Sequence, residues 1–272
     1  MSLPIAIQVF SVRNEAEADL LGTLKRIKEL GYDGVEFAGL YGHSGAQVKA
    51  MCEQVGLVPI SGHISMYDIN TTGIDELVAT YAEIGVKFLA MAWLAEEDRP
   101  GGANWDNTLK VMTEFGKKAK AAGITFLYHN HDFEFEKLDG KYLLDIIYDS
   151  IPADYLQSEL DTCWVNVGGE EPAAYIAKFA GRAPVVHLKD FVGSKSENMY
   201  ELIGDDKAKS ERQSTFGLRH VGQGVQNFPA IIESAISSGA QWLVVEQDNP
   251  SPDMTPFECA QKSREYLKSI GY

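Results

Sequence analysis

Imidazole and carboxylate side chains gather in four short segments of the second half of the chain, HNHDFEF, ELD, VVHLKD and VVEQD. Each segment ends or follows an apolar run typical of a buried strand. Side chains two residues apart share a face of a strand, which pairs His187 with Lys189, Glu159 with Asp161, and Glu246 with Asp248. Histidine with several carboxylates makes a nitrogen and oxygen site, which suits Mn, Mg, Co or Zn better than a thiolate-selective metal.

Polar side chains also end the other apolar runs of the chain. They are Gln8, Ser11 and Arg13, then Glu36, His63 and Trp93, and finally His129, Asn130 and His131. A single strand-end carboxylate is more often a helix cap or an ion-pair partner. Four of the six histidines lie at strand ends, and carboxylates recur on successive strands, so this pattern favours a shared site over scattered surface polarity.

The elements that must position these residues recur as a helix ending in glycine, a short turn and an apolar run. The glycines are Gly31, Gly56, Gly85, Gly123 and Gly239, each placed where a helix end takes the left-handed conformation. Further strands are predicted at Ile5–Phe10, Leu156–Asp161 and Val185–Asp190, and a long helix is predicted after Asn104 as its cap. The total is eight strands alternating with about eight helices.

Alternating strands and helices predict parallel strands, and eight units in 272 residues predict one closed (β/α)8 TIM barrel over residues 1–272. A doubly wound open sheet is the competing fold. It would require a glycine-rich fingerprint after the first strand, and Val9–Arg13 contains none. The polar stretch Val192–Gly224 is predicted to be a long loop after the seventh strand.

Composition restricts the partners of the chain. The net charge of −15 argues against a nucleic-acid partner, and Lys117, Lys118 and Lys120 are interpreted as the solvated face of a helix. Three scattered cysteines favour a reducing compartment. No signal peptide and no membrane-spanning run is visible, which predicts a cytoplasmic protein. The oligomeric state stays open, with a homo-oligomer as one option.

The HNHDFEF, ELDTCW, VVHLKD and VVEQD segments together resemble the sugar phosphate isomerase/epimerase superfamily with xylose isomerase-like barrels, near the branch of inosose dehydratase and keto-glycoside lyases. The resemblance implies a divalent metal held by residues from strands five to eight. Asp161, His187 and Glu246 match three of these ligands. Many relatives have Glu-Asn-His where this chain has His129-Asn130-His131, so the fourth ligand is either His129 or Glu134; we favour Glu134.

The resemblance also implies proton abstraction beside a carbonyl of a small-molecule sugar, such as a ketose, an inosose or a keto-sugar, through a metal-stabilised enediolate. His131 is the first candidate base and Glu159 the second, while Lys189 would orient or stabilise a substrate oxygen. The expected substrate contacts are His63, Trp93, His129 and Arg219. The glycines of Val221–Phe228 could hold substrate, but a tight turn explains them equally well.

Three hypotheses follow from the sequence. The first is a metal-dependent sugar isomerase or epimerase, with a keto-sugar dehydratase or lyase using the same site as the alternative. The second is an endonuclease IV-like nuclease, which the acidic charge and the six histidines disfavour. The third is a non-catalytic sugar-binding barrel, which measurement of bound metal would distinguish from the first.

Overall fold

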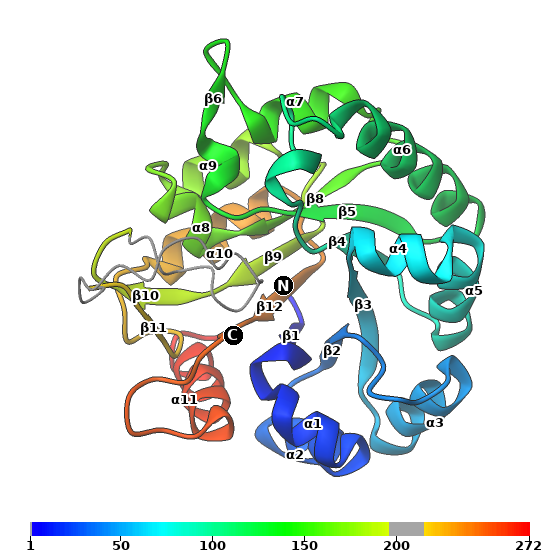
Figure 1. Ribbon diagram of the computed structural model, residues 1–272. Helices are drawn as coiled ribbons and strands as arrows, with labels where there is room; N and C mark the ends of the chain where they lie inside the picture. The colour runs from blue at the N-terminus through cyan, green and yellow to red at the C-terminus, as the bar shows by residue number, and fades with distance from the viewer. Residues whose placement is uncertain (1, 196–214) are drawn as a thin grey trace.

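Eight parallel strands close into a barrel in the computed structural model, which describes residues 2–195 and 215–272 (Figure 1). The strands are β1 (Ile5–Gln8), β2 (Gly34–Ala38), β3 (Val58–Ile64), β4 (Phe88–Met91), β5 (Thr125–His129), β8 (Gln157–Asp161), β9 (Val185–Leu188) and β12 (Trp242–Val245). Each pairs with its neighbours in chain order, and β1 closes the barrel against β12. The predicted TIM barrel is therefore confirmed.

Helices surround the barrel and connect successive strands (Figure 1). They are α1 (Arg13–Ala18), α2 (Leu20–Leu30), α3 (Gly45–Val55), α4 (Met66–Thr72), α5 (Ile74–Ile84), α6 (Trp105–Ala121), α7 (Leu143–Ser150), α8 (Thr162–Val167), α9 (Pro172–Lys178), α10 (Phe228–Ser237) and α11 (Pro256–Ser269). The short helices α1, α4 and α8 add to the predicted set of about eight. None of the described helices has the length and apolarity that crossing a membrane requires.

Helix ends follow from local sequence. Gly31, Gly56 and Gly85 end α2, α3 and α5 with φ between 76° and 93°, a conformation that glycine adopts without steric cost. Ser44 and Thr255 begin α3 and α11 with capping boxes, in which the hydroxyl and a side chain three residues later bond each other's backbone N–H. Asn104 is the N-cap residue of α6, as predicted, but its side chain makes no capping hydrogen bond.

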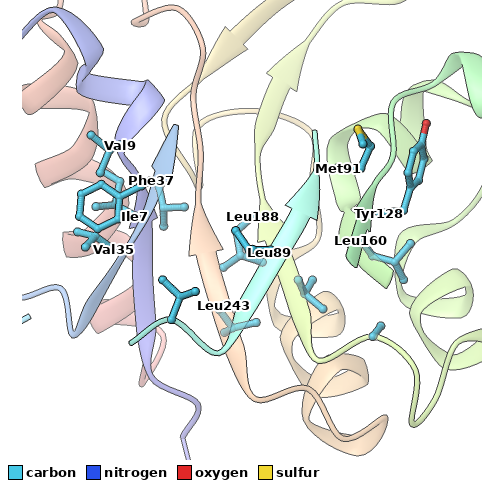
Figure 2. Packing of buried hydrophobic residues seen from close by; sticks show 14 of the residues in the cluster. Ile7, Val9, Val35, Phe37, Leu89, Met91, Tyr128, Leu160, Leu188 and Leu243 are labelled. Carbon is cyan, nitrogen blue, oxygen red and sulfur yellow. The ribbon is translucent and has the colours of Figure 1, made fainter. Parts of the chain in front are cut away.

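Successive side chains of each strand point to opposite faces of the barrel wall, so the apolar core forms two separate clusters. Ile7, Leu89 and Leu188 belong to the large cluster between strands and helices (Figure 2). Small and medium apolar side chains of the opposite face form a separate cluster inside the barrel: Ala6, Ile60, Phe88, Ala90, Leu127, Val185 and Val244. On four strands the residue two positions after such an interior residue is polar, namely Gln8, His129, His187 and Glu246. The barrel floor is thus apolar, and its C-terminal mouth is polar.

Two predicted strand ends differ from the structure. The first strand stops at Gln8, because residues Val9–Val12 form a 3-10 turn. The seventh stops at Leu188, since the next residues leave the barrel as β10 (Asp190–Val192), which pairs antiparallel with β11 (Gly217–Arg219). Much of the predicted loop Val192–Gly224 lies outside the described residues. A second small hairpin joins β6 (Lys137–Leu138) to β7 (Lys141–Tyr142).

Candidate metal centre and its surroundings

Four buried side chains converge at the C-terminal mouth of the barrel, and we name them the Glu246 cluster: His129, Asp161, His187 and Glu246. One ligand atom from each lies within 4.8 Å of the others. His129 Nε2 lies 3.5 Å from Asp161 Oδ2 and 3.6 Å from Glu246 Oε2. His187 Nδ1 lies 2.9 Å from the same Glu246 oxygen. Two imidazoles and two carboxylates at this spacing suit a divalent ion.

The carboxylate of Asp161 is held by its place at the start of α8. Its Oδ1 accepts hydrogen bonds from the backbone N–H groups of Cys163 (2.8 Å) and Trp164 (3.2 Å), as an N-cap does. Asn130 fixes the same backbone, donating to the Asp161 carbonyl and accepting from its N–H. Oδ2 accepts no hydrogen bond in the described part of the chain and faces the cluster. One oxygen is therefore structural, while the other is available to a ligand.

Lys189 is a buried cation beside the Glu246 cluster. Its ammonium lies 3.2 Å from Asp161 Oδ2, 2.9 Å from Glu246 Oε2 and 3.3 Å from Asp248 Oδ2. Burial alone would lower the pKa of Lys189, but Asp161 and the two other carboxylates raise it well above its usual value. The lysine is therefore charged at neutral pH. Burial raises the pKa of Asp161, but Lys189 and His129 together outweigh it and leave the pKa at about 2.

The structure brings His129, and not Glu134, to the other three predicted ligands. Glu134 lies in the 3-10 turn Phe133–Phe135, where Tyr128 Oη donates to Oε1 and the His131 N–H donates to Oε2 over 2.8 Å. Both oxygens of this buried carboxylate are therefore occupied within its own segment. The sequence could not reveal this fold-back, because the turn is set by contacts to the preceding strand.

His131, the predicted base, is buried in a stack of aromatic rings. Its ring lies 5.1 Å from that of Phe133 at 3° and 5.5 Å from that of Trp164 at 27°. Burial lowers the pKa of His131 well below its usual value, and the neighbouring His129 and Lys189 lower it further. Its Nδ1 has no hydrogen-bond partner among the described residues. A neutral imidazole with a free ring nitrogen is suited to accepting a proton.

A second group adjoins the first, and we name it the Glu36 cluster: Glu36, His63, Glu159 and His187. His63 Nε2 lies 2.6 Å from Glu159 Oε2 and 3.1 Å from Glu36 Oε1. Burial disfavours protonation of His63, but Glu36 and Glu159 outweigh it and raise its pKa to about 10. Glu36 was noted in the sequence as a strand end without a role. Its position towards the C-terminal end of β2 was the available signal, and in the structure Gln8 Nε2 of β1 donates to its Oε1 over 2.8 Å.

The remaining predicted substrate contacts are more loosely tied to these clusters. Trp93 is half-buried just after β4. Arg219 of β11 lies opposite Asp190 of β10 in the antiparallel strand register, and its guanidinium donates to the Leu218 carbonyl. The glycine loop Val221–Phe228 wraps the Asp190 carboxylate, which accepts from the N–H groups of Gly222 (3.0 Å) and Gly224 (2.7 Å). Because these donors face a carboxylate, the loop is a turn rather than a phosphate cradle.

Glu134 gives a testable pH dependence of stability. Burial raises its pKa to about 7, although the bonds from Tyr128 and His131 favour ionisation. An unfolded Glu has a pKa of about 4.3, so the folded state retains a proton that the unfolded state loses, and stability falls as pH rises through this window. We expect the free energy of unfolding of Glu134→Gln, relative to that of the wild type, to rise by about 2–3 kcal/mol between pH 5 and pH 8. Urea unfolding at several pH values measures this difference. A difference that is constant with pH would refute the raised pKa.

The chain is a closed TIM barrel whose mouth holds a buried cluster of histidines and carboxylates, consistent with a divalent metal site. The sequence matches the family described as Xylose isomerase-like TIM barrel over residues 24–270. The chain belongs to this family. The sequence-based resemblance to xylose isomerase-like barrels is thereby confirmed.

Named relatives are distant. Inosose dehydratase of Mesomycoplasma hyopneumoniae (strain 7448) is 26% identical over 179 residues, covering 64% of this chain and 58% of the relative. Inosose dehydratase of Bacillus thuringiensis (strain Al Hakam) is 28% identical over 173 residues, covering 60% and 54%. The matched part of the chain therefore spans less than two thirds of these relatives. A sugar phosphate isomerase/epimerase structure from Parabacteroides distasonis has a TM-score of 0.78 at 21% identity, covering 100% and 95% of the two chains, and this likeness concerns the fold.

Proposed function

We propose that this protein is a divalent-metal-dependent enzyme that removes a proton beside the carbonyl of a sugar or inosose. The observation that carries the proposal is the Glu246 cluster, where His129 Nε2 is buried without a hydrogen-bond partner in the described residues and faces Asp161 Oδ2, an oxygen that accepts no hydrogen bond there but lies 3.2 Å from the Lys189 ammonium. Buried polar atoms in this condition are costly unless a ligand satisfies them. A divalent ion there would act as a Lewis acid on the substrate carbonyl.

The surrounding residues supply the proton chemistry. We assign His131 as the base, because its lowered pKa keeps it neutral and its Nδ1 has no hydrogen-bond partner within residues 2–195 and 215–272. Lys189 is charged at neutral pH, so its ammonium stabilises negative charge that develops on a substrate oxygen. Substrate contacts are proposed for Trp93 and Arg219, on their positions after β4 and in the outer hairpin.

Elimination of water is the alternative reaction of the same site. It needs one base and one acid, and the two histidines that flank His129 differ in this way. The His63 ring centroid lies 5.1 Å from that of His129, and the His131 ring centroid lies 5.2 Å from that of His129. The pKa of His63 is raised to about 10, whereas that of His131 is lowered. A cationic acid and a neutral base support dehydration, as does the likeness to inosose dehydratases.

The test incubates the protein with Mn²⁺ in deuterated water and a panel of ketoses, inososes and 3-keto-glucosides. Deuterium at a carbon next to the carbonyl, dependent on the metal, is the expected result. Loss of water together with exchange would select the dehydratase, and exchange with epimer or isomer formation would select the isomerase. Absence of exchange and of product across the panel, with metal bound, would contradict the proposal.

The fourth ligand is tested by a matched pair of variants. We assign His129 and not Glu134, because His129 Nε2 faces both carboxylates of the cluster. His129→Gln is expected to weaken Mn²⁺ binding by at least about 10-fold, whereas Glu134→Gln changes it by less than about 3-fold. Equilibrium dialysis measures both. The reverse order would restore Glu134 as the ligand.

A further inference from the structure

The Glu36 cluster presents four ligand atoms from four different strands. They are Glu36 Oε1 from β2, His63 Nε2 from β3, Glu159 Oε2 from β8 and His187 Nε2 from β9. The nitrogen–oxygen distances are 2.6 and 3.1 Å around His63, and 2.9 and 3.5 Å around His187. Ligand atoms about 2.0–2.1 Å from a tetrahedral ion lie roughly 3.3 Å apart. These four distances are therefore close to those between neighbouring ligands of such an ion, and all four atoms lie within 4.8 Å of one another.

Hydrogen bonding alone leaves this arrangement incomplete. Each ring Nε2 carries at most one hydrogen, yet each faces two carboxylate oxygens. Glu36 Oε1 also accepts from Gln8 Nε2 over 2.8 Å. Among the described residues, His187 Nε2, Glu36 Oε2 and Glu159 Oε1 are buried and have no hydrogen-bond partner. A buried polar network with unsatisfied members is costly, and an ion at its centre would satisfy His187 Nε2 directly and bind the carboxylates of Glu36 and Glu159 through their inward oxygens.

The two clusters differ in the positively charged side chains beside them. In the Glu246 cluster the Lys189 ammonium lies 3.2 Å or less from both carboxylates. Within residues 2–195 and 215–272, the ion pairs of Glu36 and Glu159 involve only the histidines of their own cluster. Without a lysine or arginine, these two carboxylates are balanced either by protons on His63 and His187, whose pKa values they raise, or by a bound cation. The Glu36 cluster thus lacks the permanent positive charge that its neighbour has.

We propose that the Glu36 cluster is a second site for a divalent cation, of the class that prefers tetrahedral nitrogen and oxygen ligands, such as Zn²⁺ or Co²⁺. His187 is shared, because its Nε2 faces Glu36 while its Nδ1 faces Glu246, each at 2.9 Å. His187 would hold one ion through each ring nitrogen, which would require both of its N–H protons to pass to solvent. The ion enters beside His63, whose side chain is 11% exposed while those of Glu36, Glu159 and His187 are fully buried. This site does not require the proposed reaction, but an ion bound to His63 Nε2 would exclude the role of His63 as the acid of the dehydration.

The test compares metal stoichiometry in the wild type and in variants that remove one carboxylate ligand from a single cluster. Chelator-treated protein is dialysed against Co²⁺ or Zn²⁺, and bound metal is measured by elemental analysis. We expect two ions in the wild type, one in Glu36→Gln and one in Asp161→Asn. The intense visible absorption of tetrahedral Co²⁺ is expected to remain in Asp161→Asn, where only the Glu36 cluster can hold the ion. Glu265→Gln, at an exposed position of α11, is the matched control and is expected to keep both ions.

Each outcome separates this site from the proposed function. One ion that is lost in Glu36→Gln and kept in Asp161→Asn would support the second site and contradict the metal centre proposed for catalysis. One ion lost only in Asp161→Asn would overturn the second site and leave the catalytic centre intact. If Glu36→Gln fails to fold by circular dichroism, His63→Asn replaces it with the same expected loss. A wild type that binds no ion would refute both proposals.

Discussion

Replacing Glu246 with glutamine is expected to lower kcat/KM by at least about 100-fold. Glu246 Oε2 lies 2.9 Å from His187 Nδ1 and 2.9 Å from Lys189 Nζ, and it also faces His129 Nε2. Glutamine has nearly the same shape, so it removes the negative charge without opening a cavity. Removal of one electrostatic contact in an active site typically costs about 100–1,000-fold in turnover, and the same carboxylate is a proposed metal ligand.

Two measurements separate charge loss from misfolding in this variant. Mn²⁺ affinity from equilibrium dialysis should fall together with metal-dependent deuterium exchange, while circular dichroism stays that of the wild type. Glu265→Gln changes an exposed glutamate of α11 that pairs with Lys262, and it should leave both quantities unaltered. A Glu246→Gln protein with wild-type exchange would remove Glu246 from the site.

Local sequence predicted the elements well because each barrel unit repeats the same short-range signals. Gly123 and Gly239 precede β5 and β12 with positive φ, so the chain turns into a strand at the predicted positions. The two-residue alternation of strands then placed Asp161, His187 and Glu246 on one side of the barrel wall. These inferences need only neighbours along the chain.

The Glu36 cluster required information that local patterns do not hold. Glu36 and Glu159 belong to β2 and β8, whose interior faces meet only after the barrel has closed. The register shift between Val35 and Glu36 further alters which residue of β2 lies opposite Ser61. The sequence could not decide between His129 and Glu134 for a similar reason. The 3-10 turn places the Glu134 carboxylate against the Tyr128 hydroxyl, which is a contact that local patterns do not predict.

Lys189→Met is expected to destabilise the metal-free protein by about 3–5 kcal/mol, because removing one partner of a buried ion pair leaves uncompensated charge. Methionine preserves the length of the side chain, but Asp161, Glu246 and Asp248 lose the ammonium that contacts all three. Carboxylates left without this cation can take up protons instead. The loss is therefore expected to be larger at pH 8 than at pH 5, measured by urea unfolding in chelator.

Addition of Mn²⁺ should restore much of the stability of Lys189→Met, since a divalent ion bound to the same oxygens replaces the missing positive charge. The metal should also stabilise this variant more than it stabilises the wild type, because the ion no longer competes with the ammonium for Asp161 and Glu246. Deuterium exchange should nevertheless stay low, as Lys189 also acts on the substrate oxygen. Lys120→Met, which breaks an exposed pair with Asp154, is the control and should respond like the wild type. Equal stabilisation of Lys189→Met and wild type by Mn²⁺ would show that lysine and metal occupy separate environments, and would contradict the placement of the ion in the Glu246 cluster.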